Sequence, residues 1–166
     1  MAKNKWLRRT LTVALALGIV GCASEEDTVV MAPVPVVESQ FSTTKIWSTS
    51  IGNGVEQYYS KLAPAYAYDK VFVASRDGDV VALNPESGER IWSADLEKEG
   101  RPARLSGGIH AAYGQLFIGT ENGEVISLNA ETGEEVWRVE VNGEVLSEPE
   151  TDSNLVIVHT SRGALI

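Results

Sequence analysis

The side chains with the most obvious chemistry in this 166-residue chain are two histidines and one cysteine, His110, His159 and Cys22. A protein metal site gathers several such ligands in one place, but the histidines do not recur at equivalent positions of the sequence repeat described below. The glycines at 52–54 and 107–108 precede strand-like segments instead of a helix, so they indicate turns and not a phosphate-binding loop. The sequence therefore predicts no catalytic residue, no metal site and no cofactor.

The N-terminus has the pattern of a secretory signal. An apolar run at 11–20, too short to span a bilayer, follows a basic region that contains Lys3, Lys5, Arg8 and Arg9. The residues Ile19-Val-Gly-Cys22 resemble the lipobox of bacterial lipoproteins, in which the signal is removed before a cysteine that becomes lipidated. The resemblance implies cleavage between Gly21 and Cys22 and a lipid on Cys22. An ordinary secretory signal and a fortuitous free thiol are the alternatives.

A polar, proline-containing segment at 22–42 connects Cys22 to the rest of the chain. We interpret it as a tether, which at about 3.3 Å per extended residue reaches up to ~65 Å. The valines at 29–30 and 34–37 would instead suit an edge strand. In bacterial lipoproteins the residue after the cysteine directs sorting, and Ala23 in place of aspartate favours the outer membrane, at its periplasmic face. The expected domains are therefore a signal peptide at 1–21, the tether at 22–42 and a folded domain at 43–166.

Acidic residues outnumber basic ones, 23 to 14, which gives a formal net charge of −9. Residues 1–21 carry four of the basic residues and no acidic one, so the processed chain has a net charge of −13. Such a charge disfavours nucleic acid and anionic lipid headgroups as partners. A solvated surface accounts for most of the acids, and an acidic docking surface for a basic partner is the alternative. With no second cysteine, the chain forms no internal disulfide.

A repeat of 45 residues organises the folded domain. Residues 70–96 recur at 115–141 with nine identities, and a partial copy of 116–126 follows at 156–166. Three tryptophans keep the same spacing, at Trp47, Trp92 and Trp137. The repeat also places glycines at Gly78, Gly88, Gly123, Gly133 and Gly163.

Each copy predicts four short strands separated by turns. The pairs Asp77-Gly78 and Asn122-Gly123 favour type I′ hairpin turns, in which both central residues have positive φ. The segments Asn84–Gly88 and Asn129–Gly133 favour Asx-turns that end in a left-handed glycine. The strand after each Asx-turn is expected to end at its tryptophan, and the first strand of each set is expected within 62–67 or 106–112.

Four strands in a 45-residue period are typical of β-propeller blades. The apolar runs 80–83 and 125–128 suit strands buried on both faces, as in stacked blades, and fit a β-sandwich less well. We expect Trp47 in the outer strand of a closing blade, then two near-complete blades and the start of a third. About three periods are fewer than the roughly four to eight blades of a closed ring, so the chain is expected to be the N-terminal part of a longer protein. The tryptophans are expected to pack between blades and not to bind a ligand.

The segments ALNPESGERIW (82–92) and SLNAETGEEVW (127–137) resemble the quinoprotein-type propeller repeat, with Asn84 and Asn129 in place of its usual aspartate. Together with the signal, the tether and the segment 41–75, they make the chain similar to the BamB family, the propeller lipoproteins of the outer-membrane β-barrel assembly machinery. The resemblance implies a ring of about eight blades, no catalysis and no cofactor. It also implies a scaffold that binds the periplasmic domains of BamA, and other barrel-assembly subunits, to assist the insertion of β-barrel proteins.

Two alternatives share the propeller repeat. One is a quinone-dependent dehydrogenase, which by family resemblance would also need an adjacent-cysteine disulfide, calcium-binding acids and a catalytic aspartate. The sequence shows no such set, and its one cysteine, Cys22, is assigned to the lipid. The other is a different periplasmic propeller that serves as a binding module.

Overall fold

The computed structural model describes residues 32–35, 38, 40–55, 57–58, 60–152 and 154–166. The chain divides into two units, Met1–Ser42 and Thr43–Ile166, and every strand of the described residues belongs to the second. Gly21 and Cys22 lie outside the described residues, so signal cleavage and lipidation stay predictions. Within the described part of the chain, no helix has the length and apolar character needed to cross a membrane.

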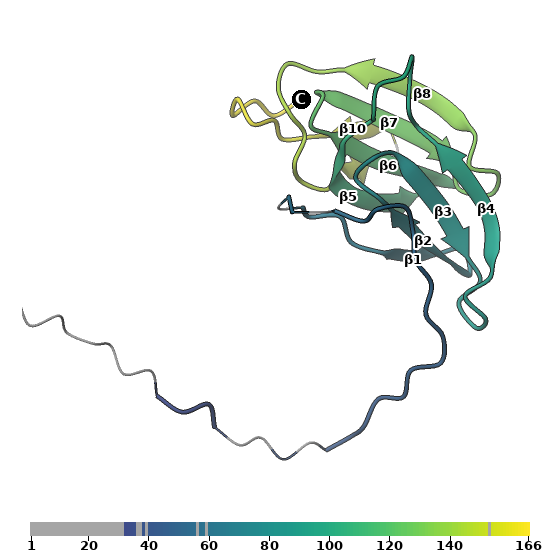
Figure 1. Cartoon of the computed structure of the whole chain (residues 1–166). Coiled ribbons are helices and arrows are strands. Elements are labelled where there is room, and N and C mark those ends of the chain that lie inside the picture. Colours follow the sequence, from purple (N-terminus) through teal and green to yellow (C-terminus); the bar gives the residue numbers. More distant parts are fainter. Residues whose placement is uncertain (1–31, 36–37, 39, 56, 59, 153) are drawn as a thin grey trace, which may run out of the picture. The chain divides into compact units, whose positions relative to one another are not determined.

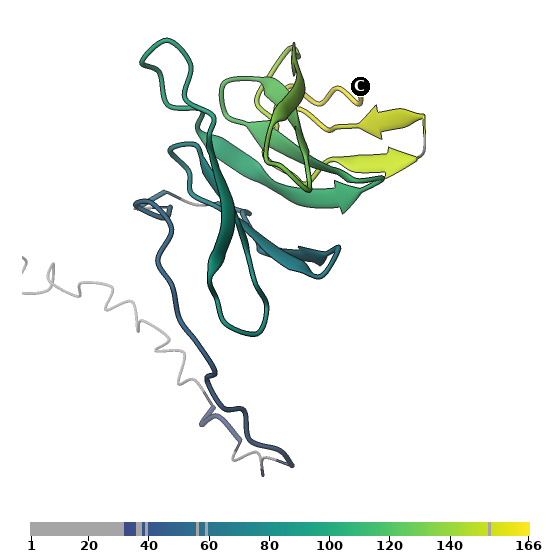
Figure 2. The ribbon, with the colours of Figure 1, turned by 90° about the vertical axis from the view of Figure 1, so that its right-hand side faces the viewer.

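Two four-stranded antiparallel sheets make up most of the second unit (Figures 1 and 2). In both sheets the strands follow one another in chain order, as in a propeller blade. The first sheet, called blade 1, contains β1 (Ala65–Ala67), β2 (Lys70–Ala74), β3 (Asp79–Leu83) and β4 (Arg90–Asp95). The second, blade 2, contains β5 (Leu105–Ala112), β6 (Gln115–Thr120), β7 (Glu124–Asn129) and β8 (Glu135–Glu140). The predicted all-β fold of four-stranded blades is confirmed.

The apolar core lies between the facing surfaces of the two blades. Phe72 and Val80 of blade 1 belong to the same buried cluster as Leu105, Leu116 and Ile126 of blade 2. Burying each of these side chains contributes about 1.5–3 kcal/mol to folding. The run Val80–Leu83 is at most 1% exposed, and Val125–Leu128 is at most 2% exposed. The prediction that both faces of these strands are covered is therefore confirmed.

The β2–β3 and β6–β7 turns differ from the prediction. Asp77 and Asn122 do not have positive φ, whereas Gly78 and Gly123 do, at 133° and 78°. Each turn is a three-residue loop, closed in blade 1 by a hydrogen bond from the Ser75 amide to the Asp79 carbonyl. A loop of this length needs positive φ only near its end, where the glycine lies. The type I′ assignment was therefore wrong.

The turn between β3 and β4 is the predicted Asx-turn. The Asn84 side chain accepts hydrogen bonds from the amides of Glu86 and Ser87 at 2.8 and 3.0 Å. Gly88 ends the turn with a φ of 73°, and the matching Gly133 in blade 2 has a φ of 78°. Asn129 makes the same pair of bonds in blade 2.

The outer strands continue beyond their tryptophans, so the predicted strand ends were wrong. Trp92 is the third residue of β4, and Trp137 is the third residue of β8. The pairing register shifts just before each tryptophan, which leaves Ile91 and Val136 as extra residues in the outer strand. Such a bulge bends the strand and redirects the next side chain. Strand pairing is interrupted only at the bulged residue and continues from the tryptophan onward, so the strand does not end at the tryptophan.

The two ends of the repeat array are less regular than the blades. Trp47 lies in a segment without strand pairing among the described residues, and its expected place in the outer strand of a closing blade stays a prediction. A strand requires a hydrogen-bonded neighbour, and no described strand pairs with this segment. The partial third copy forms β9 (Glu150–Asp152), β10 (Leu155–Ile157) and a turn at Gly163, whose φ is 80°.

Candidate binding surfaces

Each blade has two ends, which we name by the connections they carry. The hairpin rim consists of the β1–β2, β3–β4, β5–β6 and β7–β8 turns, at 68–69, 84–89, 113–114 and 130–134. The crossover rim consists of the β2–β3 and β6–β7 loops and the segments that leave each blade, at 75–78, 96–104, 121–123 and 141–149. Antiparallel pairing in chain order places these two sets at opposite ends of the strands.

A repeated backbone hydrogen bond joins successive copies at the crossover rim. The amide of Glu121, the first residue of the β6–β7 loop, donates to the carbonyl of Arg104 in the preceding crossover at 2.9 Å. The amides of Arg76 and Ser161 make the equivalent bonds to Gly54 and Glu144, at 2.9 and 2.8 Å. Because the bond uses backbone atoms, it holds neighbouring copies together regardless of their side chains.

An ion pair connects the two blades at the same rim. The Arg76 guanidinium donates two hydrogen bonds to the Glu121 carboxylate, at 2.9 and 2.5 Å, and lies 3.8 Å from the centroid of the Tyr58 ring. Hydrogen bonding to Glu121 raises the pKa of Arg76 above its ordinary value. The bidentate geometry is the strong form of a charged hydrogen bond. Arg76 and Glu121 occupy the same loop position in successive blades, 45 residues apart.

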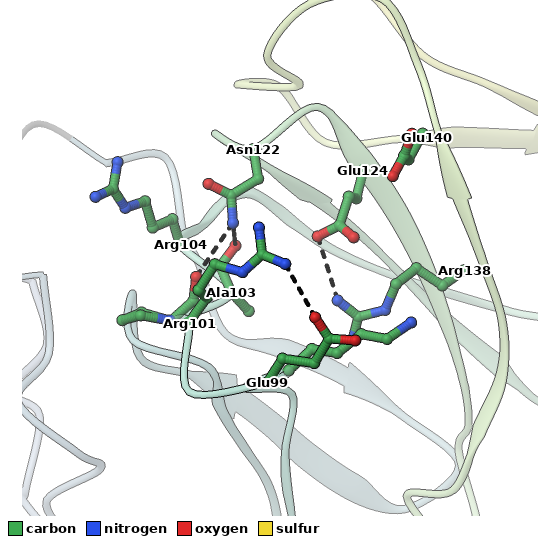
Figure 3. Close-up of a pocket in the computed structure, with 10 residues that line it drawn as sticks. Glu99, Arg101, Ala103, Arg104, Asn122, Glu124, Arg138 and Glu140 are labelled. Carbon is green, nitrogen blue, oxygen red and sulfur yellow. Dashed lines mark hydrogen bonds and ion pairs between the residues drawn. The ribbon is translucent and has the colours of Figure 1, made fainter.

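A pocket of about 590 Å³ opens beside the crossover between the blades (Figure 3). Arg138 of β8 forms part of its wall and pairs with Glu124 at 3.2 Å and with Glu135 at 2.8 Å. Burial by itself lowers the pKa of Arg138, but the hydrogen bonds and charges of Glu135 and Glu124 outweigh burial and raise it. The Arg138 side chain is 10% exposed, so these partners fix its position.

The charges around this pocket largely neutralise one another. Glu99 accepts a hydrogen bond from Arg101 at 3.1 Å, and Figure 3 draws this pair among the side chains that line the pocket. The Asn122 side chain donates to the carbonyls of Pro102 and Ala103 at 3.1 and 3.2 Å. The lining therefore suits polar contact with another protein surface. It does not bring a nucleophile and a base together among the described residues.

Tryptophans link the outer edge of one segment to the turn of the next. The Trp92 indole nitrogen donates to the carbonyl of Ala130 in blade 2 at 3.2 Å. A Cβ at Gly133 would lie 2.6 Å from the Trp92 ring, so only glycine allows this close approach. Trp47 makes the same contacts with Pro85 and Gly88 of blade 1, with a hydrogen bond of 2.7 Å.

The tryptophans are partly exposed and not fully buried. Trp137 packs against the small cluster of Val125, Val145 and Val158, and its ring centroid lies 5.9 Å from that of Phe117. Of the two histidines, His110 contacts Glu148 at 3.3 Å, and His159 is exposed. No group of three or more potential metal ligands occurs among the described residues.

The ion pairs between and within blades were missed from the sequence. Arg76 and Glu121 occupy the same position of the repeat and have opposite charges. A comparison of the charges in the two copies would have identified this pair. Arg138 gives no such signal, because the equivalent residue in blade 1 is Ser93.

Comparison with known proteins agrees with this fold and assigns a family. The family model described as "Outer membrane protein assembly factor BamB" matches residues 34–105 and 76–166. The protein of that name from Vibrio cholerae is 65% identical over 98% of this chain, and the one from Escherichia coli is 46% identical over 84%. This chain spans 42% and 37% of the length of those two relatives.

A solved structure gives the same result. The crystal structure of BamB from Moraxella catarrhalis matches with a TM-score of 0.54 and 28% identity, over 63% of this chain and 30% of that one. The family model covers most of the sequence, and the structural match covers 63% of it. The chain therefore belongs to the BamB family of outer-membrane protein assembly factors.

Proposed function

We propose that the protein is a non-catalytic scaffold that assists the assembly and insertion of β-barrel proteins into the outer membrane by binding the barrel-assembly subunit BamA. The observation that carries this proposal is the 65% identity, over nearly the whole chain, to a protein named as an outer-membrane assembly factor. Because the chain spans about two fifths of the length of such relatives, the proposal concerns the full-length protein.

The architecture supports a scaffold role. Backbone hydrogen bonds, a bidentate ion pair and the tryptophan contacts connect successive copies of the repeat. A surface held in this way loses little conformational entropy on binding, which favours affinity. The turns at both rims remain available to a partner. The periplasmic domains of BamA are the partner that the family resemblance implies.

Direct binding tests this proposal. The full-length protein, made without its signal, is titrated against immobilised periplasmic domains of BamA. We expect saturable binding. The periplasmic domain of an unrelated outer-membrane protein, immobilised in the same way, serves as the control. A matched assay with quinone cofactor, calcium and alcohol or sugar substrates tests the dehydrogenase alternative. Substrate oxidation without BamA binding would overturn the scaffold proposal.

Lipid attachment at Cys22 is the second part of the proposal, and it would hold the scaffold at the periplasmic face of the outer membrane. Cys22→Ser is expected to yield a soluble or unprocessed protein in membrane fractionation. Ala23→Asp is a matched control, because it keeps the lipid but is expected to move the protein to the inner membrane. Membrane partition equal to that of the wild type, for a Cys22→Ser protein whose signal has been removed, would contradict the anchor.

A further inference from the structure

Two tyrosines occupy equivalent exposed positions on the hairpin rim. Tyr68 begins the β1–β2 turn, and Tyr113 begins the β5–β6 turn, 45 residues later. Their exposed fractions are 43% and 62%. Tyr66, on β1, is 67% exposed. An exposed tyrosine by itself needs no explanation, but two repeated tyrosines on one rim, with Tyr66 in the same hairpin as Tyr68, expose several aromatic rings.

The backbone at both turns is unfavourable for tyrosine. Tyr68 and Asp69 have φ values of 51° and 52°, and Tyr113 and Gly114 have values of 52° and 73°. These are two-residue turns with positive φ at both central positions, where asparagine, aspartate and glycine are favoured. A bulky side chain in this region is a conformational outlier. Tyrosine at both positions therefore costs stability that asparagine would not.

Hydrogen bonds tie two of these side chains to the turns of the rim. The Tyr68 hydroxyl accepts a hydrogen bond of 2.8 Å from the Gly114 amide, so its ring reaches the neighbouring turn that carries Tyr113. The Tyr66 hydroxyl lies 3.4 Å from the Asp69 carboxylate in the same hairpin. The rings of Tyr66 and Tyr113 leave large fractions of their surface to solvent.

The hairpin rim that carries these rings is acidic. The hairpin rim contains five acidic residues, which are Asp69, Glu86, Glu89, Glu131 and Glu134. Lys70, at the start of β2, is already paired with Glu131 at 2.7 Å. The surface therefore combines aromatic faces with excess negative charge, which is complementary to a cationic partner.

We propose that the hairpin rim around Tyr68 and Tyr113 is a docking surface for an arginine-bearing segment of a partner protein. Arginine stacks on aromatic rings and pairs with carboxylates, so it satisfies both features of the surface. The chain shows this contact internally, where the Arg76 guanidinium lies 3.8 Å from the centroid of the Tyr58 ring. The inference concerns the surface and the chemistry of the partner, and it does not require that BamA be that partner.

The test uses the full-length protein and fluorescein-labelled 12-residue peptides of alternating arginine and serine. Matched peptides carry lysine or glutamate in place of arginine. We expect the arginine peptide to bind more tightly than the lysine peptide and the glutamate peptide to show no binding in fluorescence anisotropy. The affinity for the arginine peptide falls as salt increases.

The decisive variant is Tyr68→Asn combined with Tyr113→Asn, because asparagine suits the positive φ of both turns. We expect this variant to have the same unfolding temperature as the wild type or a higher one. Its affinity for the arginine peptide should fall at least tenfold. Tyr113→Phe, which keeps the ring, is the matched control and should stay within threefold of the wild type.

Three results would overturn the docking surface. The first is equal affinity of the asparagine variant and the wild type for the arginine peptide. The second is equal binding of the glutamate peptide. The third is a change in oligomeric state of the asparagine variant in size-exclusion chromatography, with peptide binding unchanged, which would assign the rim to a second copy of the chain. If the asparagine variant unfolds, Tyr113→Phe and Glu86→Gln replace it. We expect Tyr113→Phe to retain binding of the arginine peptide and Glu86→Gln to weaken it. The reverse result would contradict the proposal.

Discussion

The two rims of the blades each contain one ion pair between blade 1 and blade 2, but the surroundings of the pairs differ. At the crossover rim, the side chains of Arg76 and Glu121 are 11% and 21% exposed. At the hairpin rim, those of Lys70 and Glu131 are 13% and 76% exposed. The first pair is bidentate and largely enclosed, whereas the carboxylate of the second faces water. The crossover rim therefore uses its charges to hold the blades together, and the hairpin rim leaves most of its charges available.

Removing the contact between Trp92 and the β7–β8 turn should have the largest effect, because a large ring that joins the two blades is lost. Trp92→Ala is expected to lower the free energy of unfolding of the full-length protein by about 2–4 kcal/mol, since a large and partly buried ring is lost. Denaturant unfolding measures the change. Trp92→Phe, which keeps most of the ring contact, should cost clearly less. Equal costs for the two variants would show that the indole does not connect the blades.

Loss of the crossover-rim ion pair should come next. Glu121→Ala leaves the enclosed Arg76 guanidinium without its carboxylate and is expected to cost about 1.5–3 kcal/mol. A double-mutant cycle with Arg76→Ala isolates the coupling between the two side chains. A coupling energy near zero would mean that this rim does not stabilise the pair of blades.

The hairpin-rim pair should contribute least. Glu131→Ala removes an exposed carboxylate and is expected to cost about 0.2–1 kcal/mol. Because exposed charges are screened, the cost should vanish near 1 M salt, where the Debye length is about 3 Å. The cost of Glu121→Ala should persist under the same conditions. A larger cost for Glu131→Ala than for Glu121→Ala would reverse the comparison between the rims.

The sequence repeat allowed most of the blade architecture to be predicted. Alternating runs of apolar residues and turn residues are local signals, so the strands around Val80–Leu83 and the Asx-turn at Asn84 were identified. The turn types were harder to predict, because the type of a hairpin turn depends on the length of the loop, and that length depends on where strand pairing ends. The type I′ conformation predicted at Asp77-Gly78 occurs instead at Tyr68-Asp69 and Tyr113-Gly114, where tyrosine gives no signal for it.

Contacts between copies were largely invisible in the sequence. The Arg76 to Glu121 pair and the approach of Trp92 to Gly133 depend on how one blade lies against the next. The position of each tryptophan also depends on the bulge at Ile91 or Val136, which no local residue pattern predicted. The family, by contrast, followed from the repeat together with the signal sequence, because both are readable along the chain.

The most direct test of the proposed function is a pull-down from detergent-solubilised outer membranes with the full-length protein as bait. The account predicts that barrel-assembly subunits, BamA among them, are recovered with the wild-type bait and with the Glu131→Ala bait, which keeps its blades together. Recovery of no barrel-assembly subunit by the wild-type bait, with its fold verified by circular dichroism, would contradict the scaffold role.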